Sequence, residues 1–441
     1  MYTLNEKLVA AFLAILAISG AVGPVAAEDA VTLELAAGDY DRQGTIAAVE
    51  LPAALAKAGN LTLTRLGDNR PIAVQVQPGD KPKAVWIVRD KLPAGKTRGY
   101  RLAVAKGKPA EKCAVSVEDD GKHLVVEIGG KHVFSYNHAV VPSPNPKTPY
   151  YAKSGHIHPL FDPAGRLLTD DFNPDHAHQH GIMFAWRKTL FEGRHTNGWD
   201  QKTGSGKVEH VKVEATGCGP VLGFFDARLR QVDLTAPGGP KPVLNESWLV
   251  TVYNFADHYL FDIQSTQTCA GPSPLEVEEI HYGGMTIRAA ASWCHGTKFD
   301  YTTNEGKTRV DGNHSRPAWV DIQGPLLDLC KVDARSKTVP SGSRAAPSVI
   351  GGASVNKDGT SGVTIMDHPS NFRFPQPVRM HPTMPYFCFV PAHLGSFKIE
   401  PGKPYVSRYR FYVHEGKLEK SQIERLWNDY AHPAEVRVVS E

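Results

Sequence analysis

Short runs of apolar and β-branched residues, separated by glycine and proline, make up most of this chain, which contains 40 glycines and 33 prolines. Residues 123–128 and 131–136 flank Gly129-Gly130, and a two-residue Gly-Gly connection predicts a tight β-hairpin. Residues 246–253 and 259–266 predict a second pair of strands. Residues 405–413 alternate between apolar and polar side chains, which is typical of a half-buried antiparallel strand. The pattern therefore predicts an all-β protein.

Helical periodicity is convincing only near the C-terminus. Apolar side chains recur there at helical spacing, and Pro433 ends the run: Leu418, Ile423, Leu426, Trp427 and Tyr430. We expect a single C-terminal helix that packs against a sheet.

Two domains are predicted by the distribution of strand signals. Residues 28–109 contain strand-like segments at 31–35, 61–64 and 84–88, followed by a polar, turn-forming linker, and we expect a small β-sandwich domain. Residues 113–441 continue with short strands and show no second break. A run of this length predicts a large antiparallel β-supersandwich, in which two large sheets stack face to face.

The first 27 residues read as a signal peptide, because the apolar stretch 8–22 is followed by the small-residue site Val25-Ala26-Ala27. We therefore expect a secreted or periplasmic protein with no integral membrane segment in the mature chain. The net charge is only +3, and no basic block is interleaved with aromatics, so nucleic acid is not an expected partner. The six cysteines are scattered, and their spacing leaves disulfides and free thiols equally open.

The highest density of side chains suited to catalysis or metal binding is a group of histidines within 25 residues of sequence. In an extended strand, His176, His178 and His180 would share one face, as would His156 and His158. Imidazole titrates near neutral pH and serves as an acid, a base or a metal ligand. We predict that one cleft of the large domain is lined by the following catalytic candidates: His156, His158, Asp175, His176, His178 and His180.

Residues suited to holding a substrate follow along the chain. Trp186 could stack on a sugar ring, and the Arg187 guanidinium matches the geometry of a carboxylate. Loops that carry function commonly follow strands, as the Asp367-His368-Pro369-Ser370-Asn371 segment does. The substrate-binding candidates are Trp186, Arg187, His281, Arg288, His368 and Asn371.

A metal is an open alternative for the same histidines. His-x-His within a strand is half of a site for Zn, Cu, Fe or Mn, and Asp175 could add a carboxylate. A metal site would require at least three of the catalytic candidates to converge. Nothing in the spacing demands a divalent metal, so the cofactor stays unknown at this stage.

Several motifs together resemble a family of exported bacterial proteins that is commonly labelled "methane oxygenase PmoA". The resemblance covers roughly residues 120–435 and rests on the following segments: His158-Pro159, Pro163-Ala164-Gly165, Asp175-His176-Ala177-His178, Phe184-Ala185-Trp186, Asp367-His368-Pro369-Ser370-Asn371, and the ending Tyr409-Arg410-Phe411-Tyr412-Val413-His414-Glu415-Gly416. Members of that family commonly look like parts of carbohydrate-utilisation systems. The ending is also similar to sandwich proteins of the mutarotase and polysaccharide-lyase kind.

These observations lead to one functional hypothesis and two alternatives. We expect a secreted carbohydrate-active protein that performs acid/base chemistry (hydrolysis, elimination or epimerisation) on a glycan or sugar acid. The first alternative is a non-catalytic glycan-binding or surface-assembly protein. The second, which the family label implies, is a metal-dependent oxygenase.

Overall fold

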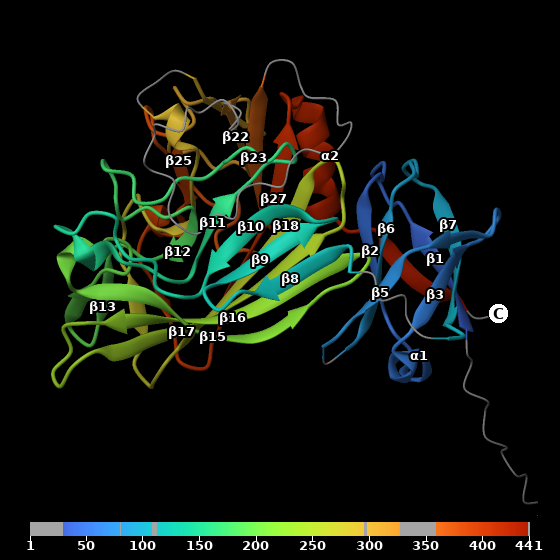
Figure 1. Cartoon of the computed structure of the whole chain (residues 1–441), viewed down its shortest axis with the longest axis horizontal. Coiled ribbons are helices and arrows are strands. Elements are labelled where there is room, and N and C mark those ends of the chain that lie inside the picture. Colours follow the sequence, from blue (N-terminus) through green and yellow to red (C-terminus); the bar gives the residue numbers. More distant parts are fainter. Residues whose placement is uncertain (1–29, 80, 108–112, 295–297, 327–358, 440–441) are drawn as a thin grey trace, which may run out of the picture.

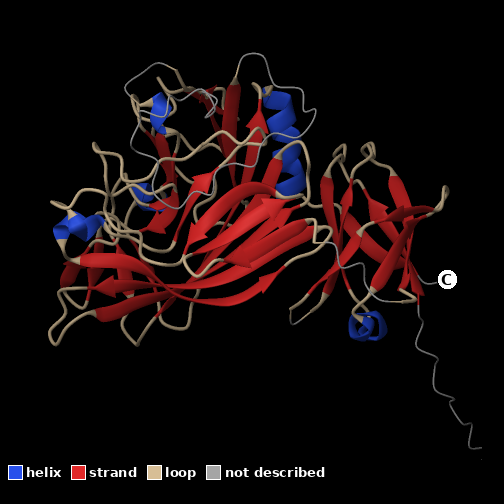
Figure 2. Cartoon of the chain, in the orientation of Figure 1, coloured by secondary structure: helices blue, strands red, loops and turns tan. Residues whose placement is uncertain are grey.

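Strands dominate the computed structural model, which describes residues 30–79, 81–107, 113–294, 298–326 and 359–439 (Figure 2). The predicted signal peptide and Cys330 lie outside these residues. The all-β prediction is confirmed, and the helix predicted near the C-terminus is α2 (Lys420–Ala431). Among the described residues, no helix combines the length and the apolar character that crossing a membrane would require.

The first domain is a small sandwich of two antiparallel sheets, with α1 (Ala53–Ala58) at one end (Figure 1). One sheet has the order β28 (Glu435–Val439), β1 (Ala30–Ala36), β7 (Thr97–Val104), β3 (Leu61–Arg65) and β4 (Arg70–Ile72). The other has the order β2 (Thr45–Glu50), β6 (Lys83–Val88) and β5 (Val74–Gln77). The last strand of the chain, β28, pairs with β1, so the first domain is completed by a segment from the far end of the sequence.

The large domain is built on two eight-stranded sheets. The first sheet has the order β24 (Val378–Met380), β25 (Tyr386–Phe389), β20 (Gly284–Arg288), β12 (Ile182–Ala185), β11 (His156–Leu160), β10 (Lys131–Asn137), β9 (His123–Ile128) and β8 (Val115–Asp119). The second has the order β15 (Gly206–Gly217), β16 (Leu222–Asp233), β17 (Lys241–Tyr253), β18 (Tyr259–Cys269), β27 (Tyr405–Glu415), β23 (Thr360–Asp367), β22 (Trp319–Pro325) and β21 (Asp300–Thr303).

A four-stranded sheet flanks this sandwich, in the order β14 (Arg194–Thr196), β13 (Thr189–Phe191), β19 (Leu275–Val277) and β26 (Phe397–Ile399). In the described part of the chain, the connections contain four short 3-10 turns: η1 (Pro149–Tyr151), η2 (Gln201–Thr203), η3 (Ala291–Trp293) and η5 (Pro391–Leu394). Cys113 and Cys218 form a disulfide, whereas Cys269, Cys294 and Cys388 are free thiols.

The main core fills the space between the two eight-stranded sheets. Phe134 of the first sheet and Phe261 of the second pack with ring centroids 5.1 Å apart, which fixes the inner face of each sheet. Ile157 of β11 belongs to this core. Neighbouring residues of a strand point to opposite faces, so His156 points to the outer face of the first sheet. By the same argument Arg288, the neighbour of the core residue Ile287, also points outward.

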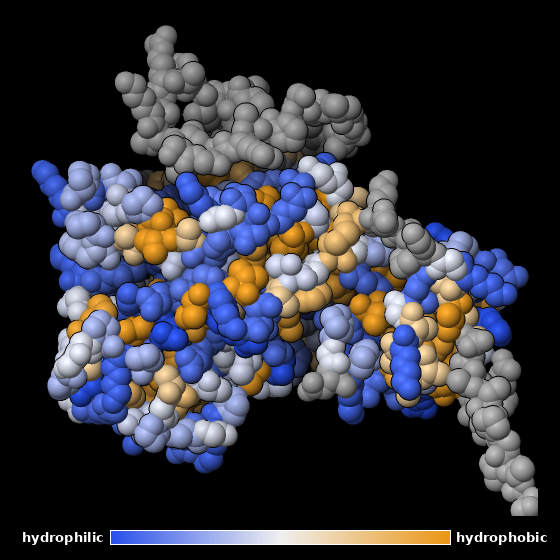
Figure 3. Space-filling model, turned by 60° about the horizontal axis from the view of Figure 1, so that its bottom comes forward, coloured by the Kyte–Doolittle hydropathy of each residue, from blue (hydrophilic) through white to orange (hydrophobic). Residues whose placement is uncertain are grey.

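In the view of Figure 3, the surface shows no feature that indicates a function. On that face, hydrophobic residues form small separate patches among hydrophilic ones. Patches of this kind are normal for a folded domain and indicate no particular partner. The buried polar side chains on the outer face of the first sheet are the more informative feature.

Candidate functional site

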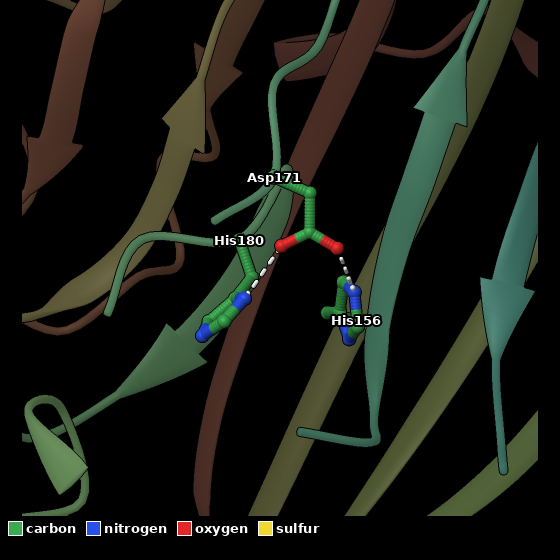
Figure 4. Close-up of side chains that lie close together, drawn as sticks. All are labelled: His156, Asp171 and His180. Atoms are coloured by element: carbon green, nitrogen blue, oxygen red, sulfur yellow. Dashed lines mark hydrogen bonds and ion pairs between the residues drawn. The ribbon is translucent and has the colours of Figure 1, made fainter. Parts of the chain in front are cut away.

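Two histidines and one aspartate meet on the outer face of the first sheet (Figure 4). The Asp171 carboxylate bridges them: its Oδ2 lies 3.1 Å from Nε2 of His156, and its Oδ1 lies 2.6 Å from Nδ1 of His180. Both imidazoles are 0% exposed. We call His156, Asp171 and His180 the buried triad. The long loop between β11 and β12, residues 161–181, folds back on itself, so His156, Asp171 and His180 become neighbours although they are far apart in the sequence.

Local contacts explain why the triad has this geometry. Asp171 and His180 face each other in an isolated antiparallel bridge. The Thr169 hydroxyl accepts a hydrogen bond from the Leu160 amide (2.9 Å) and contacts Nδ1 of His158 (3.0 Å), which ties the loop to β11. Gly181 follows with a φ of +41°, and its amide donates to the Asp170 carbonyl. The triad is therefore held from both ends of the loop.

Electrostatics keep the triad carboxylate charged. Burial alone would raise the pKa of Asp171, but the two imidazoles lower it further than burial raises it, and the pKa falls well below its usual range. Burial also lowers the pKa of His180 to about 4, despite the opposing effect of Asp171. His180 is then a neutral imidazole at neutral pH. Its Nδ1–H donates to Asp171, and among the described residues its buried Nε2 has no hydrogen-bond partner.

A second group of histidines lies beside the fully buried Arg288. His176 is 5.5 Å from His178 and 6.1 Å from His381, measured between ring centroids. Arg288 donates from Nη1 to Oε1 of Gln179 (3.1 Å) and from Nη2 to Sγ of Cys294 (3.0 Å). We call His176, His178 and His381 the histidine group.

The charges around the histidine group are mixed: Asp175 and Asp200 act on its imidazoles, and Asp170 Oδ2 lies 3.6 Å from Arg288 Nε. Burial lowers the pKa of His178 to about 4, and His176, Arg187 and Arg288 lower it further against the opposing effect of Asp200. Burial similarly lowers the pKa of His381 to about 4, with contributions from Arg379, His176 and Arg288. The group therefore consists of partly buried imidazoles that lie near both guanidinium and carboxylate groups.

An open cavity of about 440 Å³ adjoins Arg187. Its lining combines two cationic residues with small polar ones: Arg187, Lys188, His195, Thr196, Asn197, Thr203, Ser205 and Ile280. The size falls in the usual range for small-molecule sites. Arg187 links this cavity electrostatically to the histidine group, because its charge also lowers the pKa of His178.

The structure joins several of the predicted residues. His156 and His180 meet at Asp171, with ring centroids 5.3 Å apart, and the two His-rich segments therefore form one site. His158 contacts Thr169 of the same loop. Asp175 lies close enough to His176 to raise its pKa, although burial and Arg288 lower that pKa overall. Arg187 and Arg288 both act on His178.

Four of the predicted substrate-binding residues lie elsewhere. Trp186 is a core residue, 1% exposed, whose Nε1 donates to Oε1 of Gln267 (2.8 Å), so its ring is covered. His281 belongs to a separate cluster with His314, at 5.8 Å between ring centroids.

The other two lie beside α2 and β27. The His368 ring packs edge-on against Tyr430 of α2 at 4.9 Å. The Asn371 amide donates to Asp367 Oδ1 and to the Arg408 carbonyl, both at 2.7 Å, and so holds its own loop. None of the interactions in the described part of the chain connects either residue to the buried triad.

Asp171 is the residue that sequence reasoning missed. It follows Asp170 in an irregular loop, where neither a strand nor a helix period applies, and only the bridge to His180 brings it to the histidines. Within the described residues, the buried triad is the only group of at least three His, Cys, Asp or Glu side chains with ligand atoms close enough to share a metal ion, all lying within 4.8 Å of one another. The metal set predicted from sequence, which contained Asp175, shares only His156 and His180 with the observed group.

The fold and the site define a class: an all-β protein of two domains, with histidines clustered on the outer face of a supersandwich sheet. Residues 123–428 match the model of a family of unknown function, DUF6807, and the chain belongs to this family. The match begins at β9 and ends within α2, so it contains the buried triad and the histidine group but excludes the first domain. No curated protein matches the chain.

Proposed function

We propose that this protein is an exported, carbohydrate-active enzyme that performs acid/base chemistry on a glycan or sugar acid. The observation that carries the proposal is the combination of the open, cation-lined cavity with the adjoining histidine group. Imidazole is the side chain best suited to exchange protons near neutral pH. The Arg187 guanidinium in the cavity lining favours a substrate that carries a carboxylate.

A sugar acid would use these groups in a defined order. Its carboxylate pairs with Arg187, which lines the cavity and offers a planar, two-pronged donor. An imidazole of the histidine group then removes the proton from the carbon next to the carboxylate, and the electron pair moves into the carboxylate as an enolate. The enolate either expels the β-oxygen substituent, which takes the proton that this imidazole has just gained, or receives a proton on the opposite face from a water molecule, whose hydroxide is then neutralised by that imidazolium. The first course is elimination and the second is epimerisation.

The test is turnover of a panel of oligosaccharides with and without uronic acid units. Elimination creates a conjugated double bond that absorbs in the ultraviolet, epimerisation changes the sugar's NMR spectrum, and hydrolysis releases reducing ends. We expect turnover of acidic glycans, and a loss of about 100-fold or more in kcat for His178→Ala, the usual effect of removing an acid/base residue. Arg187→Ala should raise KM for acidic glycans more than for neutral ones.

The control is His123→Ala, because His123 lies on β9 and pairs with Asp120 outside the cleft. This variant should retain full activity. Binding of glycans that survives with no turnover by the wild-type protein would contradict the enzyme proposal and indicate a non-catalytic glycan-binding protein. The oxygenase function implied by the family label is favoured only by the metal-compatible geometry of the buried triad.

Export is part of the same proposal. The Cys113–Cys218 disulfide supports it, because structural disulfides persist in oxidising compartments and are rare in the cytosol. N-terminal sequencing of protein recovered from the periplasm or the medium should show cleavage after Ala27. Full-length protein confined to the cytosol would contradict the proposal.

A further inference from the structure

We infer that the buried triad of His156, Asp171 and His180 binds one divalent first-row transition metal ion. Two imidazole nitrogens and a carboxylate oxygen form a donor set that Zn²⁺, Co²⁺, Fe²⁺ and Mn²⁺ accept. The inference concerns the loop between β11 and β12 and does not depend on the sugar-acid proposal.

The distances between the donor atoms already suit a metal. Nε2 of His156 lies 3.1 Å from Asp171 Oδ2, Nδ1 of His180 lies 2.6 Å from Oδ1, and all three ligand atoms fall within 4.8 Å. Ligands at ~2.0–2.2 Å from a metal are at most ~4.4 Å apart, so small rotations of the two rings are enough. On binding, each imidazole proton moves to the other ring nitrogen (Nδ1 of His156, Nε2 of His180), and the freed lone pairs coordinate the metal together with the carboxylate.

The charge of Asp171 supports the same conclusion. Its side chain is 7% exposed, and the imidazoles of His156 and His180 are its only ion-pair partners among the described residues. No described Lys or Arg nitrogen lies within 4.0 Å of it. The nearby Lys153, itself buried, donates instead to the Val208 carbonyl at 3.4 Å. A buried carboxylate without a firm cationic partner is costly, and a bound cation removes that cost.

A comparison within the molecule separates the triad from an ordinary structural pair. His414 and Asp321 are also buried, but the Asp321 carboxylate contacts only this one imidazole among the described residues. Both nitrogens of His414 have partners: Nε2 contacts Asp321 at 3.0 Å, and Nδ1 contacts the Gly416 carbonyl at 2.8 Å. In the triad, Nδ1 of His156 and Nε2 of His180 are buried with no hydrogen-bond partner among the described residues. These two nitrogens are not the ones that contact Asp171, so they can hold the ring protons while the opposite nitrogens bind a metal.

The loop is also held in a strained conformation at this point. Phe172, next to Asp171, has a φ of +54°, and its ring packs edge-on against His180 at 4.7 Å. A bulky residue with positive φ is unfavourable and is typically retained where the local geometry serves a function. Phe172 fixes the ring plane of His180, as a preorganised ligand requires.

The experiment is a metal titration of untagged full-length protein that has been stripped with a chelator. Co²⁺ should bind at one equivalent with visible absorption bands typical of nitrogen and oxygen ligands, Zn²⁺ should displace it, and both should raise the melting temperature. Mg²⁺ should have no effect, because it prefers oxygen donors. Asp171→Asn and His180→Gln should each lower the affinity for Co²⁺ by about 100-fold or more.

The matched control is Asp321→Asn, which breaks the other buried His–Asp pair and should leave stoichiometric Co²⁺ binding intact. If the triad variants do not fold, the wild-type spectrum still decides the question. Fewer than about one-tenth equivalent of Co²⁺ bound by the wild type, or undiminished binding by Asp171→Asn, would overturn the inference. If the wild-type protein binds the metal but turns over no glycan, that result would contradict the proposed function and leave the metal inference standing.

Discussion

At the scale of single residues, the geometry of the buried triad depends on Gly181. A Cβ added to it would lie 2.1 Å from the Ile157 carbonyl oxygen, and backbone atoms of a central strand cannot move aside cheaply. Its φ of +41° also disfavours any side chain. We expect Gly181→Ala to lower the free energy of unfolding by about 2–5 kcal/mol, the sum of overpacking and left-handed backbone strain.

Urea unfolding measures this prediction, and Gly193→Ala provides the control. Gly193 also has a positive φ, +76°, but an added Cβ would meet nothing within 4 Å. Its substitution should therefore cost only the backbone strain, about 1–2 kcal/mol. Equal losses for the two variants would show that the close approach to Ile157 does not matter.

Asp367 illustrates how a single buried carboxyl makes stability depend on pH. Burial raises its pKa to about 7, against the hydrogen bonds it accepts from the Gln376 amide and the Asn371 side chain. The folded state then binds a proton that the unfolded state has released above about pH 4. The stabilisation is fully present below that pH and is lost as the pH rises to about 7, at about 1.4 kcal/mol per pH unit.

We expect Asp367→Asn to flatten this decline, because the amide does not titrate. Its absolute stability should fall, since an amide nitrogen cannot accept a hydrogen bond, so the slope is the diagnostic quantity. Urea unfolding at several pH values between about 5 and 7 gives that slope. Asp41→Asn, at an exposed position, is the control, and parallel curves for Asp367→Asn and wild type would contradict the assigned pKa.

At the scale of elements, local patterns predicted well wherever the chain forms hairpins. The strands β9 and β10 flank Gly129-Gly130 as expected, and the predicted segments 246–253 and 259–266 lie within the paired strands β17 and β18. The His176–His180 segment was predicted as a strand, and this prediction was wrong. Asn173-Pro174-Asp175 starts a turn there: the Asn173 carbonyl accepts from the His176 amide, and its side chain accepts from the Asp175 amide.

Because the His176–His180 segment forms a turn and not a strand, only part of the site could be predicted from the sequence. The density of histidines identified the correct region, and His156 and His180 do meet. The alternating pattern could not indicate which nitrogen faces which carboxylate, because the turn sets those directions and Asp171 enters through a bridge outside any strand. Pairings such as β12 with β20 also join segments about 100 residues apart, and no local pattern specifies such a register.

At the scale of the whole molecule, segments from both ends of the chain take part in the connection between the two domains. Besides the pairing of β28 with β1, the loop after β1 packs against α2: the Tyr40 ring stacks on His432 at 5.2 Å, and Arg425 donates to the Gln43 carbonyl at 2.7 Å. Figure 1 shows α2 between the large sandwich and the first domain. The helix predicted simply to pack against a sheet therefore also connects the domains.

A buried ion pair lies at the centre of this connection between the domains. Arg42 Nη1 lies 2.9 Å from Asp429 Oδ1, with the two side chains 2% and 5% exposed, and Arg42 Nε donates to the Ala37 carbonyl. Arg42→Ala leaves the Asp429 carboxylate buried, and among the described residues its remaining ion-pair partner is Arg425 at 3.7 Å. Removing one partner of a buried pair costs about 3–5 kcal/mol. Calorimetry should show a lower melting temperature, with the first domain unfolding separately. Lys91→Ala breaks the exposed pair with Asp41 and should cost less than about 1 kcal/mol, so a similar loss in both variants would refute the role of Arg42 in coupling the domains.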